Sequence, residues 1–405
     1  MKKILILTSS HLCRNPRVVK EATTLGAAGY DVTVMSLSVQ RGFAELDLEL
    51  MRGLPFKRVV LDYAADTAAV RIADFLQRAA TWSARKLCAA WDIETAQALG
   101  PASALLRFAR KFPADLTIVH TEIPIWAAQY LIREGRRVAV DVEDWYSEDL
   151  LVADRKSRPL RLLRRAEQFA LQHATYASTT GQSMANALAA EYRCAPPVVL
   201  RNSFPLQPLT RLDVPAVSSV PRFVWFSQTI GPGRGLELFF AAWGRTTHPS
   251  QVFLIGEERP GYRQELLESL PPARRADLQF IPLAKPEQLP EKLTGFDIGL
   301  ALEPRWPVNK DLTISNKILQ YLNAGLAVIA TDTAGQREVM MAAPESGLLV
   351  TDHETGDNAR QLDALIGDPG RLRMAQRAAR AAAEREFSWE HETPRLLAAV
   401  ARALS

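Results

Sequence analysis

The sequence predicts an α/β protein built from two doubly wound parallel sheets, and three observations support this. Segments with the pattern of buried strands alternate with helical segments from residue 4 onward. The same alternation starts again after a proline-rich stretch at residues 203–221. The chain has 405 residues, which exceeds the length at which one hydrophobic core usually suffices.

The first half opens with a strand–helix–strand unit. Residues 4–7 form a short apolar run that is typical of a buried strand. Asn15 offers a side chain that caps a helix start, and Pro16 has the backbone angle of a first helical residue. Gly29 follows the apolar stripe of this helix, where a glycine commonly ends one. Later strands are expected at residues 31–37, 58–61, 116–120 and 137–141.

The second half repeats this pattern after a linker. The four prolines and the polar residues of residues 203–221 oppose both helix and strand. A last helical pattern covers residues 389–404. We therefore expect domains at residues 1–205 and 206–387, followed by a C-terminal helix at residues 388–405. Strands of the second domain are expected at residues 223–227, 252–256, 278–281, 298–303, 327–331 and 347–350.

Composition and charge limit the classes of function. The sequence is 47% apolar and 23% charged, which is ordinary for a folded globular protein. Its formal net charge of +4 suits anionic ligands or anionic lipid surfaces, but it is too small to predict a nucleic-acid partner. The three cysteines are far apart and form no CxxC pair, so we expect neither a disulfide framework nor a zinc site.

The N-terminal residues and the hydropathy of the chain indicate where in the cell the protein is expected. The apolar run at residues 4–7 is too short for the core of a signal peptide. No run of about 18 apolar residues occurs, so no transmembrane helix is expected. We expect a cytoplasmic protein, with association on the cytoplasmic face of a membrane left open.

The most informative segment is SNKILQYLNAGLAVIATD at residues 315–332. A helix pattern with polar residues at its start ends at Gly325, and a buried strand follows. Asn316 and Lys317 therefore lie in the first helical turn, where backbone N–H groups point outward and the helix dipole is positive. This geometry binds a phosphate, and the lysine adds a full positive charge.

This segment resembles the nucleotide-sugar site of glycosyltransferase family 4, in which it often reads NK…EY…AGxPVIATD. The resemblance extends in order over most of the chain. It implies the GT-B fold, in which two Rossmann-like domains face each other across a cleft and a C-terminal helix crosses back to the first domain. It also implies transfer of a sugar from a nucleotide-diphosphate sugar, with retention of configuration and without a metal or other cofactor.

The resemblance gives each domain a ligand. The second domain would bind the nucleotide-sugar donor, and the first would bind a saccharide or lipid-linked saccharide acceptor. The family also points to the synthesis of bacterial envelope or capsule polysaccharides or of glycolipids. The positions that match the family's donor segments are Gly233, Gly235, Glu303, Asn316, Gln320, Gly335, Gln336 and Glu338.

A glycine-rich loop opens the second domain. Gly233 and Gly235 flank Arg234 after a predicted strand, so the backbone can approach a diphosphate while the arginine supplies charge. The loop lacks the Gly-Lys-Ser/Thr ending of a Walker loop. Gln228 stands where family members usually carry an arginine, and Arg234 stands for their lysine. A tight strand–helix turn would explain the glycines but not the arginine.

The family's paired glutamates are absent from this chain. Aligned on Ala324-Gly325, the two positions are Leu312 and Gln320. Gln320 still offers hydrogen bonds to a ribose hydroxyl, without the charge of a carboxylate. Glu303 and Asp311 are both candidates for the missing acid.

A further segment, residues 335–338, takes the place of the family's GGxxE sequence, with Ala334 at one glycine. Glu338 is either a donor-binding residue or a carboxylate stabilised by a helix N-terminus.

Acidic residues in the first domain follow a predicted strand. Glu143 and Asp144 resemble the family's acceptor-facing D-x-H/E-D/E segment, and such carboxylates orient an acceptor hydroxyl. The alternative is helix capping, which is the expected role of the next acids along the chain. His120 ends the preceding strand, and Arg17 lies beyond the first strand. The predicted acceptor-binding residues are Arg17, His120 and Glu143, and the predicted catalytic residues are Arg234, Lys317 and Asp144.

Two segments are candidates for contact with a membrane. Residues 155–165 contain six basic residues among leucines. Residues 71–87 hold arginines every seven residues in a helical pattern that also contains Phe75 and Trp82. Basic amphipathic helices bind anionic headgroups, although an ordinary solvated helix face gives the same pattern.

The predicted activity is therefore that of a metal-independent glycosyltransferase, and three alternatives stay open. A sugar-nucleotide 2-epimerase shares the fold but acts on the donor alone. A carbohydrate-binding protein with a degenerate donor site would account for the missing glutamates. A dinucleotide-dependent oxidoreductase fits the α/β pattern, but no GxGxxG follows residues 4–7.

Overall fold

The computed structural model describes residues 1–208, 220–285, 287–351 and 355–405. Of the predicted linker, residues 209–219 lie outside the described residues.

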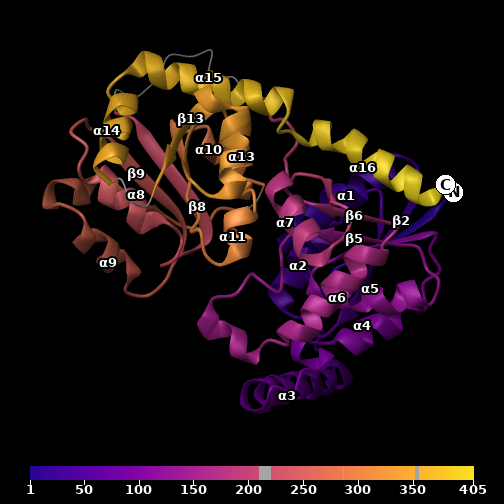
Figure 1. The fold of residues 1–405 in the computed structure, drawn as a ribbon. Coiled ribbons are helices and arrows are strands. Elements are labelled where there is room, and N and C mark those ends of the chain that lie inside the picture. Colours follow the sequence, from indigo (N-terminus) through magenta and orange to yellow (C-terminus); the bar gives the residue numbers. More distant parts are fainter. Residues whose placement is uncertain (209–219, 286, 352–354) are drawn as a thin grey trace. The chain divides into compact units, whose positions relative to one another are not determined.

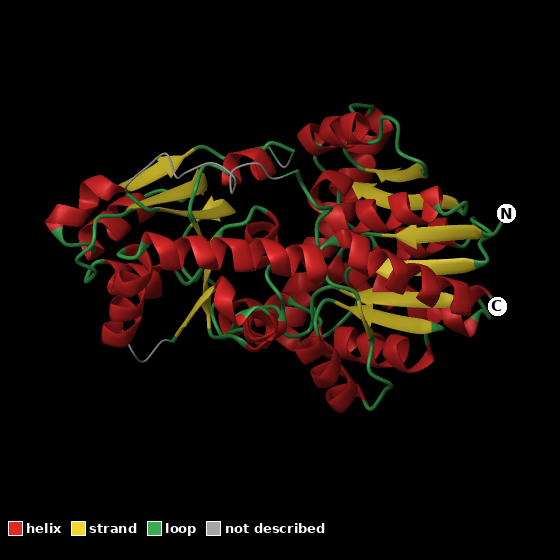
Figure 2. Cartoon of the chain, turned by 90° about the horizontal axis from the view of Figure 1, so that it is seen from above, coloured by secondary structure: helices red, strands yellow, loops and turns green. Residues whose placement is uncertain are grey.

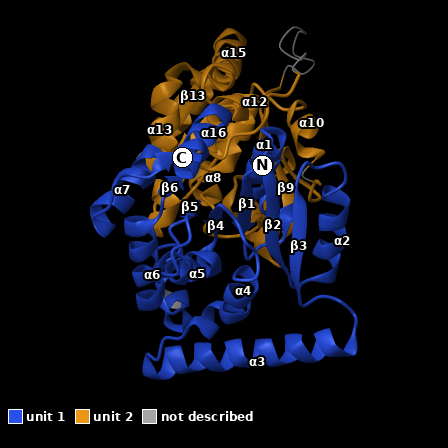
Figure 3. Ribbon diagram, turned by 90° about the vertical axis from the view of Figure 1, so that its right-hand side faces the viewer, with its two compact units in different colours: residues 1–200, 393–405 blue, residues 201–392 orange. Residues whose placement is uncertain are grey.

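The chain divides into two compact units (Figure 3). The first unit comprises Met1–Leu200 and Thr393–Ser405, and the second comprises Arg201–Glu392. These divisions lie close to the predicted domain boundaries, and the last residues of the chain are grouped with the first unit.

The first unit contains a parallel sheet with helices alternating between its strands along the chain (Figure 1). The strand order is β3-β2-β1-β4-β5-β6-β7. Its strands are β1 (Lys3–Leu7), β2 (Asp31–Ser38), β3 (Lys57–Asp62), β4 (Leu116–His120), β5 (Val138–Val142), β6 (Tyr176–Thr179) and β7 (Val198–Val199). Its helices are α1 (Pro16–Ala27), α2 (Arg41–Leu50), α3 (Ala68–Trp91), α4 (Ala102–Ala109), α5 (Glu122–Arg133), α6 (Leu160–His173) and α7 (Gln182–Tyr192).

The second unit contains another parallel sheet, with the order β10-β9-β8-β11-β12-β13. Its strands are β8 (Arg222–Ile230), β9 (Gln251–Glu258), β10 (Leu278–Ile281), β11 (Ile298–Ala301), β12 (Ala327–Thr331) and β13 (Gly347–Val350). Its helices are α8 (Leu236–Trp243), α9 (Tyr262–Ser269), α10 (Leu289–Leu293), α11 (Val308–Leu312), α12 (Asn316–Asn323), α13 (Ala334–Ala342), α14 (Thr355–Ile366) and α15 (Pro369–Arg385). The final helix is α16 (Trp389–Leu404).

The predicted class of two parallel α/β sheets is confirmed, and the packing explains why the strands were predictable. Helices flank the strands of each sheet (Figure 2). In the second unit, Phe223 and Trp225 enter one core cluster, whereas Val224 between them enters another. Strands covered on both faces read as continuous apolar runs, which is the pattern of Ile4 to Leu7 in β1.

Some strands differ from the prediction. β6 and β7 have no counterpart among the predicted strands, because they are short and β6 is made largely of small and polar residues. β8 runs on to Ile230 rather than ending at Ser227. An irregularity in its pairing lies between Phe226 and Thr229, after which Thr229 and Ile230 pair with β9 again. The glycine-rich loop therefore begins at Gly231.

Candidate functional site

The strand order places a site at the carboxyl ends of β8 and β11. The strand order reverses between these two neighbours. β9 and β10 follow on one side of β8, whereas β12 and β13 follow on the other side of β11. Ligands of open α/β sheets bind at such a point, outside the carboxyl ends of the strands. The loop at residues 231–235 follows β8, and Leu302-Glu303 follows β11.

Gly235 brings the glycine-rich loop against Glu303. Its φ is +76°, in the left-handed region that favours glycine. A Cβ at this position would lie 3.1 Å from the Cβ of Leu302 and 3.5 Å from the backbone nitrogen of Glu303. Arg234 is half-buried beside it, and no hydrogen bond or ion pair joins its guanidinium to any residue that the structure describes.

The N-terminus of α12 supplies the next groups of the site. Ser315 caps the helix by accepting a hydrogen bond from the backbone N–H of Lys317. The Ser315 hydroxyl also donates to Glu303 Oε1, at 3.1 Å. Lys317 Nζ lies 2.6 Å from the same oxygen and 5.7 Å from the centre of the Trp225 ring. The Lys317 side chain is almost fully buried, so this ion pair is largely shielded from solvent.

The charges around Glu303 keep it ionised. Burial alone would raise the pKa of this carboxyl, but the ammonium groups of Lys317 and Lys310 bring the pKa below its ordinary value. Asp311, the other candidate for the missing acid, instead accepts a hydrogen bond from the backbone N–H of Ala334 at the start of α13. Of the two candidate acids, Glu303 is therefore the one that contacts Lys317.

Two glutamines offer buried acceptors near this point. Gln320 Oε1 and Gln336 Oε1 have no hydrogen-bond partner within the described part of the chain. The Gln336 side chain is fully buried, and its Nε2 donates to the carbonyl of Ala301 at the end of β11. A buried acceptor without a donor is costly, so a ligand hydroxyl that reached either oxygen would gain a hydrogen bond.

Other predicted donor residues differ in their surroundings. Gly335 lies against the backbone of Thr313, where a Cβ would be 2.5 Å from the carbonyl carbon, so this close approach needs glycine. Asn316 is exposed on the first turn of α12. Glu338 Oε1 lies 3.8 Å from Arg201 Nη2, and Glu338 is not in the first turn of α13. The proposed helix-terminus role of Glu338 is therefore wrong.

The first unit has its own switch in strand order, between β1 and β4. Ser9 follows β1 and Thr121 follows β4, and their hydroxyl groups lie 2.6 Å apart. Thr121 has a φ of +67°, a strained conformation for a β-branched residue. Such strain is concentrated at functional sites, and here it adjoins His120.

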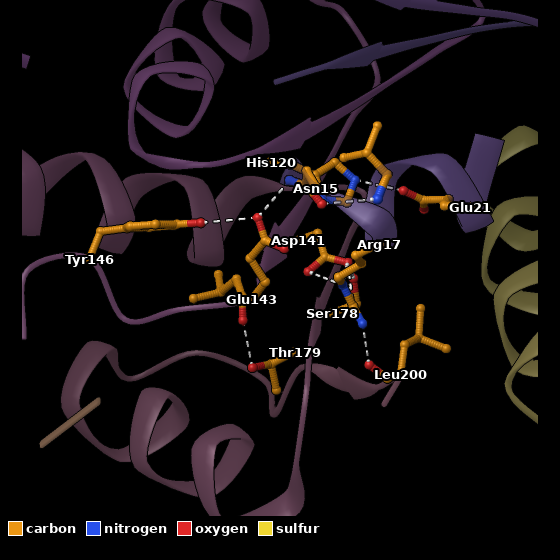
Figure 4. Close-up of polar contacts among 12 residues, drawn as sticks. Asn15, Arg17, Glu21, His120, Asp141, Glu143, Tyr146, Ser178, Thr179 and Leu200 are labelled. Atoms are coloured by element: carbon orange, nitrogen blue, oxygen red, sulfur yellow. Dashed lines mark hydrogen bonds and ion pairs between the residues drawn. The ribbon is translucent and has the colours of Figure 1, made fainter. Parts of the chain in front are cut away.

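His120 ends β4 in a fully buried position (Figure 4). Its Nε2 lies 2.6 Å from Glu21 Oε2. Burial alone would lower the pKa of the imidazole, but Glu21 and Asp141 raise it to about 9. The protonated ring donates from both nitrogens, and Nδ1 is buried with no hydrogen-bond partner among the described residues.

Arg17 forms a buried ion pair with Asp141. Its guanidinium is buried and donates to both carboxylate oxygens of Asp141 and to the carbonyl of Leu200 (Figure 4). Burial would lower the pKa of Arg17, but Asp141 raises it above the ordinary value. The predicted acceptor contact of Arg17 stays a prediction, and in the folded chain its guanidinium is held against Asp141.

Glu143 directly follows β5, and Figure 4 shows it on the opposite side of Asp141 from Arg17. Its Oε1 accepts hydrogen bonds from Asn15 Nδ2 at 3.0 Å and from the Tyr146 hydroxyl at 3.3 Å. Burial and the neighbouring carboxylates raise its pKa to about 6, against the lowering effect of His120. Asp144 is half-buried and is one of the acids that raise it. A carboxyl with a pKa near neutrality suits proton exchange with a hydroxyl.

Sequence reasoning did not select several residues of these sites. Ser315 carries a recognisable signal, a serine directly before a helix. Trp225 lies within a predicted strand, and nothing in that pattern indicates a contact with Lys317. Thr121 is identified by its backbone angle alone.

Across residues 1–208, 220–285, 287–351 and 355–405, no group of three or more His, Cys, Asp or Glu side chains is arranged to hold a metal ion. Within the same ranges, every helix is too short or too polar to cross a lipid bilayer. The expected lack of a cofactor stays a prediction.

Comparison with known sequences identifies relatives over part of the chain. No protein-family model matches it. A D-inositol 3-phosphate glycosyltransferase of Rhodococcus jostii is 34% identical over 142 residues, which is 35% of this chain and 29% of that protein. The enzyme of the same name from Nocardia farcinica is 34% identical over 150 residues, 37% of this chain and 31% of that protein. The match thus spans about a third of the length of these relatives.

Solved structures match over the whole chain. A sucrose-phosphate synthase from Thermosynechococcus elongatus has a TM-score of 0.71 at 14% identity, covering 100% of this chain and 99% of its own. Anabaena HepE in complex with UDP-glucose has a TM-score of 0.68 at 15% identity, covering 99% and 100%. WaaG, a glycosyltransferase of lipopolysaccharide biosynthesis, has a TM-score of 0.63 at 14% identity, covering 97% and 98%. The predicted GT-B fold and the resemblance to its glycosyltransferases are confirmed.

Proposed function

We propose that this chain is a glycosyltransferase that moves a sugar from a nucleotide-diphosphate sugar to a hydroxyl group of a saccharide or lipid-linked saccharide acceptor. We further propose that it retains the anomeric configuration and acts, in the cytoplasm, in the synthesis of envelope or capsule polysaccharides or of glycolipids. The observation that carries the proposal is the place of Lys317. It lies in the first turn of α12, where Glu303 at the end of β11 holds its ammonium group.

The groups around Lys317 suit a leaving diphosphate. The bond between the anomeric carbon and the diphosphate oxygen breaks, so negative charge grows on that oxygen. The acceptor oxygen bonds to the carbon, and its proton passes to the departing diphosphate. Lys317, Arg234 and the N–H groups of the α12 terminus supply positive charge fixed in advance, and electrostatic stabilisation of this kind often lowers the barrier more than any other effect. Glu303 acts here as a positioning residue, since it holds Lys317 and is itself held by Ser315.

The sugar and ribose hydroxyls of the donor have candidate partners in the same unit. Gln320 Oε1 and Gln336 Oε1 are buried acceptors that lack a donor among the described residues. We assign Gln320, Gln336, Gly233, Gly235 and the backbone at Gly335 to donor binding.

In the first unit we assign His120, Glu143 and Asp144 to the acceptor. The titratable carboxyl of Glu143 suits the orientation of a hydroxyl. So does His120 Nδ1, which has no hydrogen-bond partner in the described part of the chain.

A uridine nucleotide is the first donor to test. HepE, which has a similar fold, has been crystallised with UDP, with UDP and glucose, and with UDP-glucose. The low identity means that the fold alone is shared, so the base is a proposal to be tested against the other nucleotides.

The experiment is a thermal-shift titration with UDP, GDP, ADP, CDP and dTDP. A ligand at 100 times its Kd adds about 2.7 kcal/mol to stability, so one base should raise the melting temperature of the wild type selectively. The Lys317→Ala variant should lose this response. Lys292→Ala removes an exposed lysine from α10 of the same unit and should keep it.

Two outcomes would contradict the proposal. A chain that responds to no nucleotide at millimolar concentration would be a non-catalytic protein with a degenerate donor site. A chain that isomerises the nucleotide sugar in the absence of an acceptor would be an epimerase.

A further inference from the structure

Helix α3 presents its larger apolar side chains to the outside. The side chains of α3 that are not exposed recur at helical spacing and are mostly small or polar: Val70, Asp74, Gln77, Thr81, Ala84, Leu87 and Cys88. The opposite arrangement is normal for a helix that packs on a core, where the apolar stripe faces inward. Figure 3 shows α3 lying along the lower edge of the first unit.

The outward face of α3 is strongly apolar. Its large apolar side chains are exposed to between 60% and 71%, namely Ile72, Phe75, Leu76, Trp82 and Trp91. Single exposed apolar residues are common on proteins, but several on one helix face form a patch of the kind that marks an interaction surface. Leu151 and Val152, at the start of a short helical segment that packs against α3, are also exposed.

Basic side chains border this face. Residues 68–91 contain four basic residues and one acidic residue. Arg71 and Arg78 are more than two-thirds exposed, and the single acid, Asp74, lies on the inward face in an ion pair with Arg78. Lys86 lies over the Trp82 ring, 5.6 Å from its centre. Aromatic and aliphatic residues flanked by Arg and Lys are typical of a helix that lies in the plane of a membrane surface.

A surface cavity of about 300 Å³ opens beside the first turns of α3. Its lining includes Tyr63 and the exposed arginines Arg41, Arg71 and Arg78, together with Asp66 and Asp74. Each of these arginines forms an ion pair with a carboxylate, so the attraction to anionic lipid rests on the net positive charge of α3 as a whole and not on this cavity.

The other basic segment, residues 155–165, has the ordinary arrangement. The apolar residues of α6 face inward, with Leu163 and Ala166 fully buried. Arginines of both segments form ion pairs, so the two segments differ in where their apolar side chains lie. This segment therefore lacks the outward apolar face that α3 offers to a bilayer.

We propose that α3 docks the protein on an anionic lipid bilayer, with Ile72, Phe75, Leu76 and Trp82 inserted among the headgroups. The apolar face supplies the insertion and the bordering arginines and Lys86 supply the attraction to anionic lipid. The docking depends on α3 and not on transfer of a sugar, so it is tested without a donor or an acceptor.

The test is flotation of the full-length chain with lipid vesicles. Vesicles of phosphatidylcholine with about 30 mol% phosphatidylglycerol should carry the wild type, and vesicles of phosphatidylcholine alone should carry less, because the electrostatic attraction is lost. The double variant Phe75→Ser/Trp82→Ser should bind anionic vesicles at least about tenfold more weakly. Both side chains are more than 60% exposed, so the variant should fold, and its thermal melt should match the wild type.

The control is Met374→Ser, which removes a similarly exposed apolar side chain from α15 and should float like the wild type. Equal flotation of the double variant, or no flotation of the wild type, would overturn the proposal. So would sedimentation showing that the wild type self-associates and the double variant does not, since a second copy would then cover the face.

Discussion

The two polar clusters at the strand ends of the two units differ in the kind of group that each leaves without a partner. In the first unit, Arg17 meets Asp141 and His120 meets Glu21 within hydrogen-bond distance. In the second unit, Glu303 and Lys317 form a pair, yet the buried oxygens of Gln320 and Gln336 lack a donor among the described residues. The first cluster leaves a ring nitrogen, His120 Nδ1, without a partner among the described residues. A ligand could therefore accept a hydrogen bond from the first cluster and donate hydrogen bonds to the second.

The two clusters also differ in whether their groups change protonation near neutral pH. The first cluster holds groups whose pKa values lie within a few units of neutrality, Glu143 at about 6 and His120 at about 9. In the second cluster, the ammonium groups of Lys317 and Lys310 lower the pKa of Glu303, so this carboxylate stays ionised across the physiological range. We therefore expect changes in the first cluster to appear in stability and its pH dependence, and changes in the second to appear in nucleotide binding and turnover.

The largest expected effect is the loss of the Arg17 ion pair. Arg17→Met keeps the length of the side chain but leaves the buried Asp141 carboxylate without its cation. Removing one partner of a buried pair costs about 3–5 kcal/mol, so the free energy of unfolding should fall by that amount. Denaturant unfolding measures it.

The matched control for Arg17 is an exposed pair on α14. Arg360 and Asp357 lie 2.8 Å apart at the surface, so Arg360→Met should change the unfolding free energy little. If the two variants were equally stable, Arg17 would not be the structural residue that its contacts indicate.

The next effect concerns turnover at the second cluster. Lys317→Ala removes the fixed charge proposed to stabilise the leaving diphosphate, and kcat should fall by roughly tenfold to a thousandfold. A coupled assay with a working donor and acceptor measures it. Unchanged kcat in this variant, with Lys292→Ala as the reference, would remove the catalytic assignment.

The pH dependence of stability tests His120. Its pKa is raised from an ordinary 6.5 to about 9, so its protonated form stabilises the folded state fully below pH 6.5. As the pH rises from 6.5 to 9, that contribution is lost, at most about 3 kcal/mol from the size of the shift. The melting temperature of the wild type should fall across this window, and that of His120→Gln should not. Parallel curves for the two proteins would contradict the assignment.

The smallest effect is expected at Gln320. Gln320→Leu removes a proposed hydrogen bond to the donor, so the Kd for the nucleotide should rise about threefold to tenfold. Stability should stay the same or increase, because a buried acceptor without a partner is removed. Calorimetric titration and a thermal melt measure the two quantities.

The control for Gln320 is Gln264→Leu, at an exposed glutamine on α9 that should leave binding unchanged. Loss of stability in Gln320→Leu would mean that its side chain already has a partner in the folded chain.

Prediction from sequence was accurate where the signal is local. The run from Ile4 to Leu7 and the helix stop at Gly325 each carry their own pattern, and the structure has β1 and the end of α12 there. It failed for β6, whose small and polar residues fit several conformations. For Arg17, the position near a strand end was predicted but its ion pair was not, because the partner Asp141 is 124 residues away along the chain.

The sequence by itself determined the two α/β sheets, the helix start at Asn316-Lys317 and the resemblance to GT-B glycosyltransferases. These follow from hydrophobic period, capping residues and short motifs, which act between neighbours along the chain. Only the tertiary structure decided that Glu303 rather than Asp311 holds Lys317, and that α3 rather than α6 turns its apolar face outward. Both depend on contacts between segments distant in sequence, and a local pattern gives the character of a side chain but not its partner.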